Sequence, residues 1–194
     1  MPGPVECQAN GTGRRMLSMW DRLVLQSDLP PPGDLPQAAV LAALYEDDEG
    51  DARVVLIKRP YTMPTHAGHI AFPGGRPDPE DHGPVETALR EAHEEVGIHP
   101  DDVEVIGFLP HIHTVEFALY VVPVVGRLAG HPHLVPSPRE VEELFQPRLE
   151  DLADDSQWHH EVWRDHRVWF YDLGGETLWG ATAWMVRNLL GMPT

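Results

Sequence analysis

The segment from Val85 to Val96 is the clearest helix in the sequence and places the strongest constraint on the fold. Its apolar residues recur at helical spacing, so one face can pack against a sheet. Gly97 follows as a residue suited to the left-handed conformation at a helix end, and Pro100 prevents the helix from continuing. We therefore expect a helix of about three turns that covers one face of a sheet.

Three glutamates, Glu91, Glu94 and Glu95, gather on one stripe of this helix. Residues three and four positions apart are neighbours on a helix, and like charges at this spacing cost roughly 0.2–0.5 kcal/mol per pair. The charges also lie in the C-terminal half of the helix, where the dipole disfavours them. A hard divalent cation relieves both penalties, and carboxylate oxygens favour Mg²⁺ or Mn²⁺ over zinc. Taken alone, the stripe is more simply interpreted as a solvated acidic helix face. The choice between this interpretation and a metal site depends on the neighbouring sequence.

Composition limits the possible partners. With 194 residues the chain can bury one good core, and its formal net charge of −17 argues against binding a nucleic acid polymer, whose phosphates it would repel. No apolar stretch is long enough to span a bilayer, so we expect no membrane association. The single cysteine, Cys7, cannot form an internal disulfide, and we expect a cytoplasmic protein. A small phosphorylated substrate remains possible if the site supplies cations.

The chain divides at a proline-rich stretch that ends at Pro36. Residues 1–36 are expected to form an amphipathic helix, Arg14 to Ser27, and a stiff connector, and residues 37–194 a single domain. Strands are expected at Ala38–Tyr45, Arg53–Lys58, Val103–Leu109 and Phe117–Val125, a hairpin or strand at Glu161–Asp172, a short helix at Glu140–Phe145 and a closing helix at Thr177–Leu190. Because strands and helices interleave, we predict an α/β fold with a sheet covered by helices on both faces.

The glutamate helix and the loop before it resemble the Nudix box, usually written G-x5-E-x7-R-E-U-x-E-E-x-G-U with U an aliphatic residue. The matching residues are Gly75, Arg90, Glu91, Glu94, Glu95, Gly97 and Ile98. Two positions depart from the pattern. Asp81 replaces the first glutamate, with one extra residue before Arg90, and Ala92 stands at the first aliphatic position. So many matches at fixed spacings argue against chance.

This resemblance implies a single-domain Nudix-type α/β/α sandwich with a mixed sheet, and a hydrolase that cuts a diphosphate linked to another group. It implies that Glu91, Glu94 and Glu95 hold Mg²⁺ or Mn²⁺ ions that bind the substrate diphosphate. It also implies catalytic roles for Glu94 and for Arg90, whose guanidinium orients a carboxylate of the cluster through charge-assisted hydrogen bonds.

The sequence before the box resembles the motif of the coenzyme A pyrophosphatase branch of this family. The similarity rests on Arg59, Gly68 and the run Phe72-Pro73-Gly74-Gly75. It implies cleavage of coenzyme A, and of its thioesters or disulfide, to 4′-phosphopantetheine and adenosine 3′,5′-bisphosphate. Members of this branch also carry an aspartate and the extra residue where Asp81 departs from the box.

The residues expected to contact the substrate are Arg59, Gly74, Gly75 and Arg76. The glycines are expected to let the backbone approach the phosphates. Pro64 stands where the branch usually has an arginine, so that phosphate contact has to come from elsewhere, and Arg59 and Arg76 are the candidates. Lys58 is a further candidate for the 3′-phosphate. Each of these three cations is equally open to interpretation as a solvated surface charge.

A further carboxylate outside the box often serves family members as a base or a metal ligand. Glu140 is the candidate here, because it opens a short apolar segment at the matching Glu-Val pair, and Glu116 is the alternative. Two other functions stay open. One is a Nudix hydrolase acting on a dinucleotide, a nucleotide sugar or a damaged nucleoside triphosphate. The other is a non-catalytic binding module of the same fold, although the intact Arg90 and glutamates argue against it.

Overall fold

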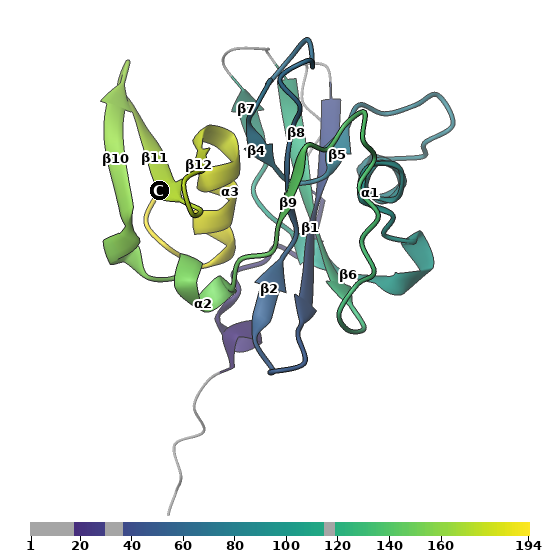
Figure 1. Ribbon diagram of the computed structural model, residues 1–194, viewed down its shortest axis with the longest axis horizontal. Helices are drawn as coiled ribbons and strands as arrows, with labels where there is room; N and C mark the ends of the chain where they lie inside the picture. Colours follow the sequence, from purple (N-terminus) through teal and green to yellow (C-terminus); the bar gives the residue numbers. More distant parts are fainter. Residues whose placement is uncertain (1–17, 30–36, 115–118) are drawn as a thin grey trace, which may run out of the picture.

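The main sheet of the protein combines parallel and antiparallel strands (Figure 1). The computed structural model describes residues 18–29, 37–114 and 119–194. In these residues the sheet contains β1 (Gln37–Glu46), β2 (Ala52–Val54), β5 (Gly74–Gly75), β6 (Val103–Phe108), β7 (Ile112–Thr114) and β8 (Leu119–Leu128). The order is β2-β1-β8-β6, with β5 also pairing β1 and β7 also pairing β8. Strands β1 and β8 run parallel in the centre, and the other pairs are antiparallel.

Two smaller sheets accompany the main one. The first, in the order β4-β3-β9, comprises β3 (Leu56–Lys58), β4 (Ile70–Ala71) and β9 (Glu143–Phe145). The second, in the order β10-β11-β12, comprises β10 (Trp158–Trp163), β11 (His166–Asp172) and β12 (Thr177–Trp179). The helices are α1 (Pro84–Val96), α2 (Leu149–Leu152) and α3 (Gly180–Leu189), with 3₁₀ turns at Met19–Arg22, Pro100–Asp102 and Asp155–Gln157.

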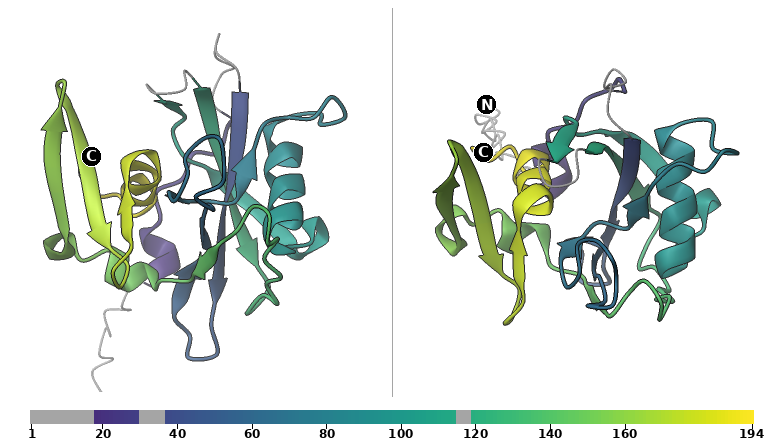
Figure 2. Two further views of the ribbon diagram at one scale, coloured as in Figure 1. Left: turned by 45° about the horizontal axis from the view of Figure 1, so that its top comes forward. Right: turned by 90° about the horizontal axis from the view of Figure 1, so that it is seen from above.

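The helices cover both faces of the main sheet, as predicted. Figures 1 and 2 show α1 on one side and α3 on the other, with α3 lying between the sheet and the β10–β11 hairpin. One core cluster joins the sheet to α1 through Ala88, Ala92 and Val96. The other joins it to α3 and the hairpin, where Trp158 and Trp169 are buried. The mixed sheet between two helical layers is therefore an α/β fold.

Helix α1 begins one residue before the predicted Val85 and ends at Val96 as predicted. Pro84 occupies its first turn, where a missing N–H costs nothing. Gly97 ends the helix in the left-handed conformation, at φ 77°, and its N–H caps carbonyls of the last turn. The strand predicted at Ala38–Tyr45 and the hairpin at Glu161–Asp172 are confirmed as β1 and as β10 with β11.

Four predicted elements differ from the structure. The predicted Arg14–Ser27 helix is wrong within the described residues, because only Met19–Arg22 is helical and Gln26 forms a β-bridge with Phe108. Glu140–Phe145 is not a helix, because its last three residues form β9 and pair with β3. The predicted Arg53–Lys58 strand is two strands, β2 and β3, in different sheets. The predicted closing helix begins as strand β12 and becomes helical only at Gly180.

The strands predicted at Val103–Leu109 and Phe117–Val125 correspond to β6 and β8, although residues 117 and 118 lie outside the described part of the chain. The domain boundary predicted at residue 36 also lies outside it and stays a prediction. No helix in the described ranges is long and apolar enough to cross a membrane.

Candidate active site

The paired glycines before the helix, Gly74 and Gly75, lie against β1 and against the side chains of α1. Gly74 and Gly75 form β5 and pair with Val40 and Ala39 of β1. The Gly74 N–H donates to Oε2 of Glu95 at 2.8 Å. Gly74 has φ 155°, and a Cβ there would collide with the β1 backbone, so no other residue fits without a shift. A hydrogen bond from the loop backbone to the Glu95 side chain thus joins the loop to the helix.

Gly75 makes room for the carboxylate of Glu91. A Cβ on Gly75 would lie 2.5 Å from Oε1 of Glu91, closer than two such atoms can approach. The absence of a side chain therefore lets the Glu91 carboxylate lie directly against the loop, between β5 and α1.

We expect Gly75→Ala to lower kcat/KM roughly 10–100-fold, the range found when groups that support a metal ligand are removed. The fold should survive, because the added Cβ meets the movable end of a side chain rather than backbone. Steady-state kinetics and the thermal midpoint check both parts. Gly83→Ala is the matched control, since a Cβ there meets nothing within 4 Å. Unchanged kinetics for Gly75→Ala would show that the position of Glu91 is unimportant.

Glu95 is the most buried carboxylate of the cluster, with its side chain 3% exposed. Burial raises the pKa of Glu95 to about 8, although the Gly74 N–H and the nearby Arg59 favour the ionised form. Arg59 Nη1 lies 3.7 Å from Oε1 of Glu95, beyond hydrogen-bonding distance. The Arg59 side chain is itself largely buried, and its Nε has no hydrogen-bond partner within the described residues. Arg59 is therefore too far from Glu95 to form a hydrogen bond, and the Glu95 carboxylate has no close positive partner among the described residues.

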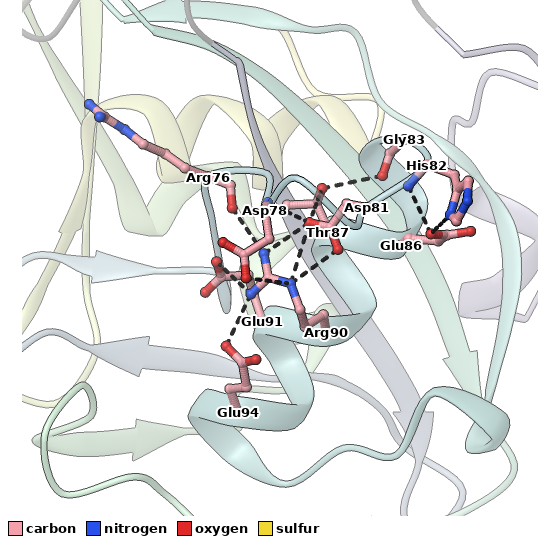
Figure 3. A network of polar contacts seen from close by, with 10 residues as sticks. All are labelled: Arg76, Asp78, Asp81, His82, Gly83, Glu86, Thr87, Arg90, Glu91 and Glu94. Carbon is pink, nitrogen blue, oxygen red and sulfur yellow. Dashed lines mark hydrogen bonds and ion pairs between the residues drawn. The ribbon is translucent and has the colours of Figure 1, made fainter.

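Arg90 is the centre of a network that includes two of the three glutamates (Figure 3). Its Nη1 donates to Oε1 of Glu91 at 3.1 Å and to Oε2 of Glu94 at 3.0 Å. Its Nη2 donates to Oδ2 of Asp81 and to the carbonyl of Arg76, both at 3.0 Å. The planar guanidinium can serve several directions at once, as a lysine ammonium cannot. Arg90 therefore links the two glutamates to the loop, and the orienting role that the resemblance implies for it stays a prediction.

Asp81, the residue that departs from the box, anchors this network. Besides Arg90 it accepts hydrogen bonds from Thr87 Oγ1 at 2.9 Å and from the Asp78 N–H at 2.9 Å. Its side chain is only 7% exposed. The hydrogen bond from Arg90 is the main reason why the pKa of Asp81 falls from 3.8 to about 2. Asp81 therefore binds Arg90 instead of facing the glutamates. The sequence did not predict this role.

Because Asp81 has a lower pKa in the folded than in the unfolded state, its contribution to stability is present above about pH 4 and lost as the pH falls through about 2. We therefore expect Asp81→Asn to lower the thermal midpoint at pH 7 and to flatten its dependence on pH below 4. Calorimetry between pH 2 and 7 checks this. The control is Asp101→Asn, whose carboxylate is 90% exposed. An unchanged acid limb in the Asp81 variant would contradict the assignment.

Glu140 lies close enough to the cluster to act on it electrostatically. Its charge raises the pKa of both Glu91 and Glu95, after the larger effect of burial. The Ser137 N–H donates to the carbonyl of Glu95, which brings the turn before Glu140 next to α1. The structure therefore brings Glu140 together with the box residues. Glu116, the alternative, lies outside the described residues.

The candidate cations have different surroundings. Arg59 lies beside Glu95, whereas Arg76 contributes its carbonyl to the Arg90 network and its side chain extends away from it (Figure 3). Lys58 is buried in an ion pair with Glu176, so the structure does not offer it as a phosphate ligand. Of the three, Arg59 is the one that the fold brings to the carboxylates.

The donor set fits a hard divalent cation. Glu91, Glu94 and Glu95 offer carboxylate oxygens within one helical turn, and the burial of Glu95 without a close counter-ion is relieved by a cation. In the described residues no three His, Cys, Asp or Glu side chains converge as a metal site. Glu91 and Glu94 accept hydrogen bonds from Arg90.

Comparison with known proteins identifies the family to which the chain belongs. The NUDIX domain family model matches residues 35–169. An uncharacterized Nudix hydrolase, NudL, of Enterobacter sp. (strain 638) is 40% identical over 79% of this chain and 80% of its own length. Nudix hydrolase 22, chloroplastic, of Arabidopsis thaliana is 38% identical over 76% of this chain but only 52% of its own length. A MutT/nudix family protein from Enterococcus faecalis shares the fold, with a TM-score of 0.57 at 17% identity over 84% of this chain and 63% of that one. The chain therefore belongs to the Nudix family and is a Nudix hydrolase.

Proposed function

We propose that this Nudix hydrolase cleaves the diphosphate bond of coenzyme A to give 4′-phosphopantetheine and adenosine 3′,5′-bisphosphate. The observation that carries the proposal is the contact between two sequence features. The segment that resembles the coenzyme A branch brings Arg59 to 3.7 Å from Glu95 and donates the Gly74 N–H to the same carboxylate. The feature typical of the branch and the box typical of the family therefore meet at one side chain.

In this proposal Glu91, Glu94 and Glu95 hold Mg²⁺ or Mn²⁺, and Arg90 keeps the first two in place. When bound, a divalent cation lowers the pKa of the attacking water and neutralises the anhydride oxygens. These three glutamates therefore have to be ionised during the reaction, with Glu94 the most accessible of them at 51% side-chain exposure.

The remaining residues act on water and substrate. The oxygen of the water attacks phosphorus while Glu140 accepts a proton from that water. The P–O–P bond then breaks, and its electron pair leaves with the bridging oxygen on the other phosphate. Arg59 contacts the diphosphate, because it is the cation beside Glu95. Arg76 is a second candidate contact, since its side chain extends from the network. Gly74 and Gly75 let the substrate approach the backbone.

The wider setting follows from charge and composition. The chain carries a net charge of −17, so an anionic substrate depends on local cations rather than on the overall field. A small molecule such as coenzyme A needs only the few cations of the site, unlike a nucleic acid polymer. The single cysteine fits a reducing compartment, and we place the enzyme in the cytoplasm.

The direct test is to incubate the purified protein with coenzyme A and Mg²⁺ or Mn²⁺ and to follow the products by chromatography. Phosphopantetheine and adenosine 3′,5′-bisphosphate should form only when metal is present. Acetyl coenzyme A and the oxidised disulfide, run in parallel, identify the preferred form. A panel with ADP-ribose, a dinucleotide, a nucleotide sugar and an oxidised nucleoside triphosphate tests the alternatives. Turnover of one of these without cleavage of coenzyme A would contradict the proposed substrate but would still agree with a Nudix hydrolase.

A further inference from the structure

Lys58, at the end of β3, has partners that the proposed reaction does not explain. The residue is only 5% exposed. Its Nζ lies 2.7 Å from Oε1 of Glu176, in the turn between β11 and β12, and 3.9 Å from Oε1 of Glu142. It also lies over the ring of Tyr61, 5.4 Å from the centroid. An ammonium group in this position requires compensating charge, so Glu176 is its principal partner.

The backbone of Lys58 holds the segment that carries Glu140. The Glu142 N–H donates to the Lys58 carbonyl at 2.8 Å. At the other end of the segment, the Ser137 N–H donates to the carbonyl of Glu95 in α1, also at 2.8 Å. The connection from residue 137 to residue 142 is therefore fixed at one end by the glutamate helix and at the other by Lys58. A shift at Lys58 moves Glu140 relative to the carboxylates.

The next residue, Arg59, is tied to the same strand end. Its N–H donates to the carbonyl of His69 at 3.0 Å, and its Nη1 lies 3.7 Å from Glu95. The ring of His69 lies 4.8 Å from that of Trp179, at the end of β12. The C-terminal unit, residues 158–189, thus meets this strand end at two points, the pair of Lys58 with Glu176 and the contact of His69 with Trp179.

We propose that Lys58 is a positioning residue, and that its ion pair with Glu176 couples the C-terminal unit to the placement of Glu140. Glu176 lies beyond residue 169, where the match to the family model ends. The C-terminal unit then helps to position an active-site residue, in addition to packing against the core. This inference rests on the proposed role of Glu140 as base.

The expected cost follows from geometry. Without Glu176 the buried ammonium keeps, among the described residues, the distant Glu142 carboxylate at 3.9 Å and the Tyr61 ring, and has to move toward Glu142 or toward water. Either movement pulls on the segment that presents Glu140. Misplacement of a reacting group by about 1 Å can cost roughly 100-fold in rate, and removal of supporting groups around a metal site costs about 10–100-fold.

The test uses Glu176→Ala, whose parent side chain is 36% exposed and whose loss the fold should tolerate. We expect kcat on coenzyme A to fall about tenfold or more with little change in KM, because the placement of the base affects the chemical step. Lys58→Met should behave alike, and the double variant should be no worse than Lys58→Met, since both changes remove the same contact. The matched control is Glu150→Ala, which removes a carboxylate paired with Arg22 at 3.1 Å.

The decisive measurement is Glu176→Ala on a Glu140→Gln background, where the effect on kcat should disappear. An undiminished effect there would show a merely structural role and overturn the inference, as would a wild-type kcat in Glu176→Ala or in Glu140→Gln. If Lys58→Met does not fold, the Glu176 variants still decide. If the wild type cleaves another diphosphate instead of coenzyme A, the proposed substrate fails, and the same cycle run with that diphosphate still tests the inference.

Discussion

Replacing Glu95 by glutamine is expected to lower kcat/KM by more than about 100-fold, the upper end of the losses for groups that only support a metal ligand. Glutamine keeps the size of the side chain and can still accept the Gly74 N–H. It removes the charge beside Arg59 and the carboxylate that a divalent cation requires. Steady-state kinetics with saturating Mg²⁺ or Mn²⁺, on whichever diphosphate the wild type cleaves, measure the loss.

The same variant should remain folded, which separates loss of catalysis from loss of structure. The pKa of Glu95 is about 8 in the folded protein, above its ordinary 4.5, so without metal the wild type loses stability as the pH rises between these values. The glutamine variant lacks this loss and should be at least as stable as the wild type at pH 8. Glu86→Gln, an exposed position on the same helix, is the control for the kinetic measurement. Activity within about tenfold of wild type for Glu95→Gln would contradict a metal-binding role.

The parts of the fold that the sequence predicted well are those encoded by near neighbours. Helix α1 follows from apolar residues at helical spacing, and Ala88, Ala92 and Val96 are indeed fully buried. Its end follows from a single glycine, Gly97, at φ 77°. Because the box lies on this helix and the loop before it, most of the candidate site could be located from residues 74–98 alone.

The parts that were predicted wrongly depend on partners far apart in the chain. The segment that forms β9 pairs with β3, more than eighty residues earlier, and this pairing overrides a locally helical pattern. The run from Arg53 to Lys58 looks continuous, yet β2 and β3 join different sheets on either side of Val55. No local periodicity specifies which strand pairs with which, so such breaks are invisible in the sequence.

The roles of charged residues show the same limit. The sequence gives the sign of Lys58 but not its partner, and the structure buries it against Glu176, 118 positions away. Asp81 appeared only as a departure from a pattern, and the structure makes it the residue that holds Arg90. The resemblance to the coenzyme A branch predicts an aspartate at this position, but the hydrogen bonds of Asp81 to Arg90 are seen only in the fold.

Replacing Arg90 by lysine is expected to damage both activity and stability, although the positive charge is retained. Arg90 donates to Asp81, Glu91, Glu94 and a carbonyl, and a lysine ammonium cannot reach these groups in their fixed directions. The Asp81 carboxylate is 7% exposed and would lose its main donor. A buried group left without its partner costs about 1–3 kcal/mol, so urea denaturation at pH 7 should show a loss of this size.

The loss of activity in Arg90→Lys should exceed what this loss of stability explains. Glu91 and Glu94 would no longer be held relative to β5, so kcat/KM should fall about 100-fold at temperatures where the variant is fully folded. The pKa of Asp81 should rise from about 2 toward its ordinary 3.8, which moves the acid limb of the stability curve upward. Arg22→Lys is the matched control, because that arginine pairs with the exposed carboxylate of Glu150 and such pairs contribute about 0–1 kcal/mol. A folded Arg90→Lys enzyme with wild-type kinetics would mean that Arg90 stabilises the loop without positioning the glutamates.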